Sequence, residues 1–329
     1  MTQKTVLLLT IALLVLTCSE PPTETRDEGL SGTTWGEKLG FPKDTRVLIL
    51  HADDAGMCPE ANEATVRYLE NDHIQSAAGM VPCPSFDDFA VWYKAHPEAD
   101  VGLHLTLTSE WKTHRWGSKA ASDEVPGLHD PEGMLWRSVS QVVQNASPDE
   151  VEKEIRAQIE HSHALGIKPS HIDTHMGTLY GHPAFTERYV KVAMEYGIPA
   201  MVIEFTDDVV ARFKEQGYPI DENMIGLGLS YTLPKLDDFH SAPNAKTYEG
   251  KKQAFYDLVR SLKPGITEII FHPSVESDSL KKITNSWQQR VWEAEMFSDP
   301  EMIRFFEDED ILFTNWKDMM KRFNDRNGG

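Results

Sequence analysis

Cysteine is scarce in this chain, which has three cysteines among its 329 residues. Cys18, Cys58 and Cys83 are too few for a disulfide framework, and no CxxC pair or zinc-ribbon spacing occurs. A single Cys58–Cys83 bond would suit an oxidising compartment, but we expect two free thiols. A hydrophobic core must therefore stabilise the fold, and a chain of this length with 40% hydrophobic residues can form a sizeable one.

Basic residues are also in short supply. The chain has 32 Lys and Arg against 52 Asp and Glu, which gives a formal net charge of -20. A nucleic-acid-binding protein normally has the opposite bias or a basic stripe, and this sequence has neither, so we expect no nucleic-acid partner. Internal repeats and low-complexity tracts are lacking too. One large α/β domain is the simplest organisation.

The sequence has one marked apolar run, at its N-terminus. The run follows Lys4, extends from Thr5 to Thr17 and is too short to span a bilayer, so it resembles the apolar part of a secretory signal. Cys18 follows directly, as in a bacterial lipoprotein signal; an ordinary signal cleaved nearby is the alternative. We predict a signal or lipoprotein-like segment over 1–18, a polar linker over 19–43, and one domain over 44–329. The protein would be exported, either periplasmic or anchored to the membrane through Cys18.

The anchor can be tested directly. If a lipid on Cys18 holds the protein to the membrane, Cys18→Ser should move it out of the membrane fraction, because the apolar run alone is too short to span the bilayer. Fractionation followed by immunoblotting measures this. A variant that stays with the membrane at the wild-type level would show that Cys18 is not the anchor.

Strand and helix patterns alternate along the domain. Short apolar runs predict strands at 47–50, 74–81, 101–107, 169–173, 200–204 and 267–272. Helices are predicted between them, including 86–95 and a strongly signalled helix that begins at Ser147-Pro148-Asp149-Glu150. Residues 109–146 form a long irregular loop. This alternation indicates a mainly parallel sheet, either open or closed into a barrel.

Ionisable residues gather at the ends of three predicted strands. Asp53 and Asp54 follow the first, His104 lies in the third, and His171, Asp173 and His175 alternate in the fourth. The carboxyl ends of parallel strands converge on one face, where active sites form. One carboxylate and two histidines make a metal-binding set that leaves positions open for water and substrate. Such a set suits metal-assisted hydrolysis.

Four motifs resemble those of the YdjC/ChbG family of carbohydrate deacetylases, in order and spacing. The family shows A-D-D-x-G, G-x-H, H-x-D-S-H and a late strand ending in H-P. The corresponding segments here are Ala52–Gly56, Gly102–His104, His171–His175 (with Thr174 in place of Ser) and His272-Pro273. The resemblance covers residues from about 46 to 316.

The resemblance implies a distorted (β/α) barrel similar to that of polysaccharide deacetylases, and a function: removal of N-acetyl groups from an amino sugar or a chitooligosaccharide-like substrate. It implies that Asp54, His104 and His175 bind one divalent metal, Mg or Zn. Asp53 would be the general base and His272 the general acid. Asp173 would orient a ligand histidine by contacting the face of it that is turned away from the metal, and His171 would belong to the same outer layer.

The chain departs from the family pattern around the site. His51 stands where the family usually has Asn, and Ala55 where it has an aromatic residue. Met176 to Pro183 replaces an H-x-H-like segment, so we expect a different pocket wall. Trp111 is a candidate to stack on a sugar ring, or else a packing anchor. Arg290 is a candidate to reach the substrate, or else a surface partner of Glu293.

Three other functions stay open at this stage. A metal-dependent phosphoesterase on a similar barrel would want a second metal or Arg and Lys clamps, which the motifs do not contain. A sugar-binding lipoprotein would explain the anchor and the tryptophans but not the Asp53-Asp54 pair. A degenerate family member would bind metal without turnover. The oligomeric state is open.

Overall fold

The computed structural model describes residues 32–328. The predicted signal, Cys18 and most of the predicted linker lie outside this range. Cys58 and Cys83 are buried free thiols, as expected. Within residues 32–328, none of the helices has the length and apolar character needed to cross a membrane.

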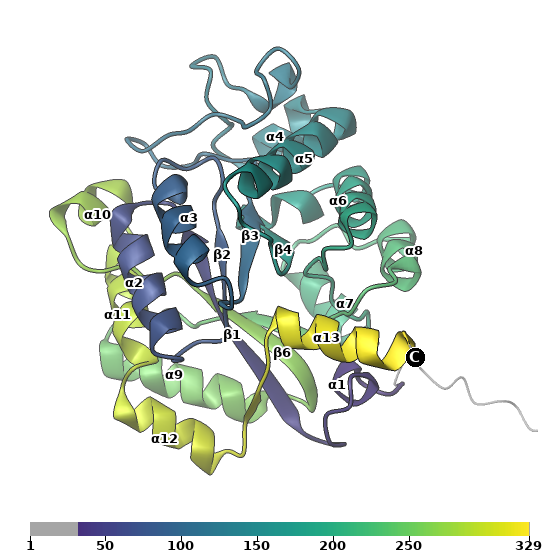
Figure 1. Ribbon diagram of the computed structural model, residues 1–329, viewed down its shortest axis with the longest axis vertical. Helices are drawn as coiled ribbons and strands as arrows, with labels where there is room; N and C mark the ends of the chain where they lie inside the picture. The colour runs from purple at the N-terminus through teal and green to yellow at the C-terminus, as the bar shows by residue number, and fades with distance from the viewer. Residues whose placement is uncertain (1–31, 329) are drawn as a thin grey trace, which may run out of the picture.

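Strands and helices alternate through the described chain (Figure 1). The strands are β1 (Arg46–Ala55), β2 (Ser76–Gly79), β3 (Val101–Leu105), β4 (Ile172–Thr174), β5 (Asp238–Ser241), β6 (Gly265–Phe271) and β7 (Leu312–Phe313). The α-helices are α1 (Trp35–Lys38), α2 (Pro59–Glu70), α3 (Phe86–Ala95), α4 (Val139–Asn145), α5 (Pro148–Ala164), α6 (Pro183–Tyr196), α7 (Asp207–Glu215), α8 (Glu222–Ser230), α9 (Tyr248–Ser261), α10 (Asp278–Ile283), α11 (Trp287–Met296), α12 (Pro300–Asp308) and α13 (Trp316–Asn327). Two 3₁₀ helices, η1 (Pro126–Leu128) and η2 (His175–Tyr180), complete the set.

The sheet is parallel and curls into a distorted barrel. Its strand order is β4-β3-β2-β1-β6-β5, and β7 pairs with the start of β1. Single bridges from Ile172 to Ala200 and from Ile203 to Leu236 span the gap between β4 and the segment that leads into β5. The distorted (β/α) barrel expected from the sequence is therefore confirmed.

The prediction of a strand at 200–204 is wrong, because these residues form no regular strand. Residues 200–203 contact their neighbours through isolated bridges instead of a continuous ladder. The reason is local, because the Val202 amide donates to the Ala200 carbonyl at 2.7 Å. The chain turns on itself there, so these groups do not extend the ladder.

Alternation along β1 determines which side chains enter the barrel. Leu48, Leu50 and Ala52 pack outward into a core shared with α9 and α12. Val47 and Ile49 point the other way, into a core inside the barrel. Because side chains alternate along a strand, His51 and Asp53 also point inward.

The N-terminal ends of the strands are covered by α1 and by α13, the yellow helix beside the C-terminus in Figure 1. Leu39 and Phe41 are buried in the inner core, and the Trp35 amide donates to Asp237 at 2.8 Å. The last part of the polar linker predicted over 19–43 is therefore wrong. Its apolar residues belong to the domain core, and polar neighbours on both sides obscured them in the sequence.

Helix α5 begins as predicted, with a complete capping box between Ser147 and Glu150. Its buried Glu154 fixes the long segment 109–146, because the carboxylate accepts hydrogen bonds from the backbone amides of Lys119 and Ala120 at 2.8–3.1 Å. The Gln158 amide donates to it as well, at 2.8 Å. The segment is ordered by these contacts and contains η1 and α4.

We expect Glu154→Gln to lower the free energy of unfolding by about 1–3 kcal/mol, because the new NH₂ group would face a buried backbone amide that needs an acceptor. Burial raises the pKa of Glu154 to about 7, so the comparison belongs at pH 8, where the carboxyl is ionised. Urea denaturation measures the difference. Glu160→Gln is the matched control on the exposed face of the same helix. Equal destabilisation of both variants would contradict the anchoring role.

Candidate active site

Asp53 and Asp54 occupy the C-terminal end of β1, where the strand is distorted. The register between β1 and β2 shifts between Ala52 and Ala55, and Asp54 has a φ of 65°. Left-handed backbone at a residue other than glycine is uncommon, and such strain gathers at functional sites. The distortion re-aims Asp54 so that both carboxylates face the mouth of the barrel, although they are neighbours in the strand.

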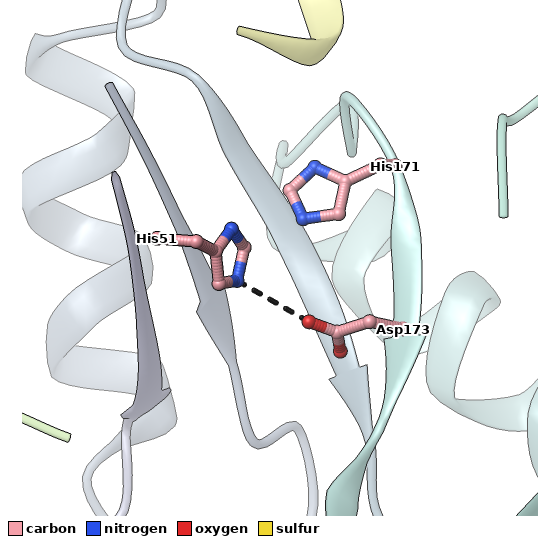
Figure 2. Close-up of side chains that lie close together, drawn as sticks. All are labelled: His51, His171 and Asp173. Atoms are coloured by element: carbon pink, nitrogen blue, oxygen red, sulfur yellow. Dashed lines mark ion pairs between the residues drawn. The ribbon is translucent and has the colours of Figure 1, made fainter. Parts of the chain in front are cut away.

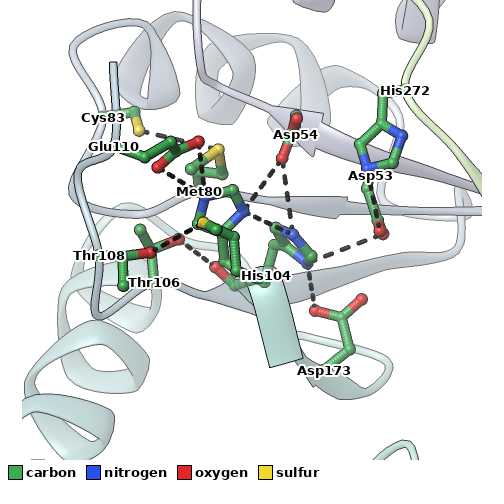
Figure 3. A network of polar contacts seen from close by, with 12 residues as sticks. Asp53, Asp54, Met80, Cys83, His104, Thr106, Thr108, Glu110, Asp173 and His272 are labelled. Carbon is green, nitrogen blue, oxygen red and sulfur yellow. Dashed lines mark hydrogen bonds and ion pairs between the residues drawn. The ribbon is translucent and has the colours of Figure 1, made fainter. Parts of the chain in front are cut away.

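Three side chains from different elements meet at this mouth, and Figure 3 labels two of them, Asp54 and His104. The Oδ1 atom of Asp54 lies 3.5 Å from His104 Nε2 and 3.4 Å from His175 Nδ1. The two histidine nitrogens are 3.2 Å apart. All three residues are at least 95% buried. We call Asp54, His104 and His175 the triad.

A carboxylate lies behind each histidine of the triad. His104 Nδ1 donates to Asp173 Oδ1 at 2.7 Å, and His175 Nε2 lies 3.1 Å from both oxygens of Glu110. A histidine that donates through one nitrogen presents the lone pair of the other, and metal-binding histidines in proteins are usually held this way. When the two triad histidines are neutral, His104 Nε2 and His175 Nδ1 would thus present their lone pairs beside Asp54 Oδ1.

The charges at the triad favour a cation. Burial alone would lower the pKa of His175, but the Glu110 and Asp54 carboxylates raise it to about 10. Burial would likewise raise the pKa of Asp54, yet the Arg290 guanidinium, which donates to Asp54 Oδ2 at 2.7 Å, holds it well below its usual range. The raised pKa of His175 indicates a negative electrostatic potential at its ring, and a metal cation would be stabilised there in the same way as the proton.

The triad fits a divalent metal. Three ligands about 2.1 Å from a tetrahedral ion would lie about 3.4 Å from one another, close to the separations of 3.2–3.5 Å found here. Asp54 Oδ1 is buried and has no hydrogen-bond donor among the described residues. A buried carboxylate oxygen without a donor is costly, and a cation would satisfy it.

A second polar layer lies deeper in the barrel. His51 Nε2 is 3.2 Å from Asp173 Oδ2, as Figure 2 shows, and 3.1 Å from Asp53 Oδ1. On its other side, His51 Nδ1 lies 3.7 Å from Glu268, which accepts from the Trp316 indole at 2.7 Å. His51 therefore links the carboxylate behind His104 to Asp53.

His171 lies farther from the triad than the sequence suggested. Its ring stacks on Trp316 with 5.1 Å between centroids, and its Nδ1 hydrogen-bonds with the Ser170 hydroxyl at 2.9 Å. Burial holds its pKa well below the usual range. Figure 2 shows the His171 ring above Asp173, opposite His51. His171 contacts neither triad histidine. Side chains two residues apart share one face of a strand but lie at successive depths of the barrel, and His171 is deeper than Asp173 and His175.

His272 directly follows β6, and its side chain is more exposed than that of Asp53 or of any triad residue. Its side chain is 35% exposed, and its Nε2 is 3.8 Å from Asp53 Oδ2. The backbone amide of His272 donates to Glu293 at 2.7 Å, and Glu293 pairs with buried Lys251. The alternative of a surface pair between Arg290 and Glu293 is therefore wrong, because both side chains are buried and each contacts a different part of the site.

A cavity of about 520 Å³ opens above the triad. Asp53, His272, Arg290 and Trp111 line it beside the triad. Trp111 also lies under the Arg290 guanidinium, 5.7 Å from ring to cation. The lining residues between 201 and 227, which we call the apolar wall, are Met201, Val202, Ile203, Phe205, Phe213, Tyr218, Ile220, Met224 and Leu227.

Sequence reasoning missed several of these groups. Glu110 lies in the long loop, six residues after His104, and no motif distinguishes it. Glu268 resembles an ordinary polar residue in an apolar strand. His51 departs from the family pattern, and the sequence alone indicates no role for it. A carboxylate inside the apolar run 265–271 was the available signal for Glu268, because such a group is rarely buried without a partner.

Comparison with known proteins agrees with the motifs. The model of the YdjC-like protein family matches residues 47–308. A carbohydrate deacetylase of Thermoanaerobacter pseudethanolicus is 26% identical over 82% of this chain and 98% of its own, and one of Brevibacillus brevis is 28% identical over 83% and 99%. A crystal structure from Enterococcus faecalis V583, described in connection with cellobiose-phosphate cleavage, aligns with a TM-score of 0.70 and 21% identity over 84% of this chain and 99% of its own, which supports the fold. The family match covers most of the described domain, so this chain belongs to the YdjC-like protein family.

Proposed function

We propose that this protein is a metal-dependent carbohydrate deacetylase that hydrolyses the N-acetyl group of an amino sugar or a short oligosaccharide. The observation that carries the proposal is the buried triad with Asp53 beside it at the mouth of a barrel. Carbohydrate deacetylases that match nearly their whole length to this chain support the same reaction.

In this proposal Asp54, His104 and His175 hold the divalent metal. When bound, such an ion polarises an amide carbonyl and makes a water molecule more acidic. Both Mg and Zn are compatible with one carboxylate and two histidines, and the two imidazoles favour Zn. Asp173 and Glu110 would orient the two ligand histidines, and Arg290 would hold Asp54 in place through its Oδ2.

Asp53 would act as the general base, because it lines the cavity next to the triad without belonging to it. His51 would hold the Asp53 carboxylate from below, at 3.1 Å. His272 would protonate the leaving amine, since it lines the same cavity on the other side of Asp53. Trp111 would contact the sugar ring, and Arg290 would act on Asp54 more than on the substrate.

A phosphoesterase is less well supported by the lining of the cavity. Among the residues that line it, Arg290 is the one Arg or Lys, and its guanidinium is paired with Asp54. A phosphate monoester needs cationic groups of its own to bind. We also propose export, with anchoring through Cys18, on the evidence of the N-terminal apolar run.

Acetate release is the direct test. The purified mature protein, loaded separately with Zn and with Mg, should release acetate from at least one member of a panel of N-acetylated mono- and oligosaccharides. A coupled enzymatic assay for acetate and mass spectrometry of the free amine measure the two products. Metal binding without release from any sugar would indicate a degenerate member of the family, and sugar binding without metal would indicate a binding protein.

A further inference from the structure

The lining of the cavity above the triad has two chemically different parts. One part carries the ionisable groups described above, most of which lie at or just beyond the ends of β1, β3, β4 and β6. Apart from the phenol of Tyr218, the apolar wall carries no nitrogen or oxygen atom in its side chains. Sugar hydroxyls placed against this wall would lose water without gaining partners, which is unfavourable.

The apolar wall is built by an insertion between two parts of the barrel. Helices α7 and α8 lie between residues 203 and 236, and Arg212 of α7 pairs with Asp238 at the start of β5. Phe205 packs closely on α8, because a Cβ at Gly228 would come within 2.8 Å of its ring. These contacts hold the wall in place over the mouth of the barrel.

The apolar wall also reaches the triad. Gly177 follows His175 by two residues and has a φ of 65°, and a Cβ there would meet the Tyr218 hydroxyl at 3.1 Å. Met176, Gly177 and Tyr218 all line the cavity. The apolar wall therefore begins, at Tyr218, beside the segment that carries His175.

From this arrangement we propose that the substrate carries an acyl chain longer than acetyl on its amide nitrogen, and that the apolar wall binds this chain. The inference rests on the proposed amide hydrolysis and names the acyl group it acts on. The sugar would lie on the side of Trp111 and His272. In the reaction the C–N bond breaks, the water oxygen forms the new bond to the acyl carbon, and the amine takes up a proton, so the products are a carboxylate and an amino sugar.

A series of N-acyl glucosamines tests the chain length, with acetyl, butanoyl, hexanoyl and octanoyl groups on the same sugar. We expect kcat/KM to rise by about threefold per added methylene as far as hexanoyl, since each buried methylene adds a hydrophobic gain of this order. Calorimetry with metal-loaded Asp53→Asn measures binding apart from turnover. It should give a lower Kd for N-hexanoyl- than for N-acetylglucosamine by at least about 10-fold.

Two leucines of α8 provide matched variants. Leu227 lines the cavity, whereas Leu229, two residues later, is 63% exposed. Leu227→Trp should lower the ratio of hexanoyl to acetyl kcat/KM by about 10-fold by filling the apolar side, and Leu229→Trp should leave the ratio unchanged.

The outcomes separate the two proposals. Acetyl hydrolysis with a flat or falling dependence on chain length would overturn the acyl-chain inference and leave the deacetylase proposal standing. Equal effects of the two tryptophan variants would overturn the assignment of the apolar wall. Failure to hydrolyse any N-acyl sugar would remove the proposed function and this inference together.

Discussion

Asp53→Asn should lower the deacetylase kcat by about 10²- to 10⁴-fold, the usual contribution of a general base, while the protein keeps its fold and its metal. Asn has nearly the shape of Asp but cannot accept the proton from water. Asp53 lines the cavity beside the triad, and it lies 3.7 Å from His104 Nδ1 without taking one of the three ligand positions. Steady-state kinetics with elemental analysis of the same sample measures both quantities.

An aspartate that follows a strand commonly caps the next helix, but the structure does not give Asp53 that role. The N-cap of α2 is Cys58, five residues later, so Asp53 makes no cap that Asn would preserve. Asp53 instead faces His51 and His272 inside the barrel. A loss of activity in Asp53→Asn would therefore report on chemistry at the site and not on the start of the helix.

Asp54→Asn is the matched control. Asn tolerates the left-handed backbone at this position, so the fold should survive, but the metal should bind more weakly because a ligand oxygen loses its charge. The two neighbouring substitutions should thus separate turnover from metal content. Full activity in Asp53→Asn with metal bound would show that another group is the base.

The parts of the site that the sequence predicted lie at strand ends. Apolar runs located the strands, and parallel strands bring their carboxyl ends together, so Asp54, His104 and His175 were expected to meet. The period of two also placed His171, Asp173 and His175 on one face of β4. It could not reveal that β4 ends at Thr174, or that the left-handed residues Met176 and Gly177 then turn the chain.

The parts that the sequence did not predict depend on contacts between distant segments. Glu110 reaches His175 because the long loop is folded back, in part by the bonds from residues 119 and 120 to Glu154. The apolar wall combines residues of α7, α8 and the segment 200–205, whose patterns separately resemble ordinary surface helices and a core strand. Residues 35–41 belong to the domain because they pack under β6 and α13, which are more than 200 residues away in the chain.

Replacing both histidines of the triad should abolish metal binding. In His104→Ala/His175→Ala a single carboxylate ligand would remain, and such a site should hold a divalent ion too weakly to survive purification. We expect about one metal per wild-type chain and close to none in the variant, with activity lower by at least about 10³-fold. Inductively coupled plasma mass spectrometry measures the content.

His161→Ala/His163→Ala is the matched control, since it removes a half-buried and an exposed histidine from the last turn of α5 and leaves the triad intact. It should keep the wild-type metal content. Equal metal in the wild type and in the triad variant would show that the ion binds elsewhere.

Metal binding should also be coupled to protons at the triad. The pKa of His175 is raised to about 10 in the metal-free protein, so at pH 7 this histidine is protonated and a metal must displace that proton. Binding should therefore release about one proton per ion, and the affinity should rise about tenfold per pH unit through the neutral range. Calorimetry in buffers of different ionisation enthalpy measures the release. Binding without proton release in the wild type would mean that His175 Nδ1 is not a ligand, because a nitrogen that keeps its proton has no lone pair to give the metal.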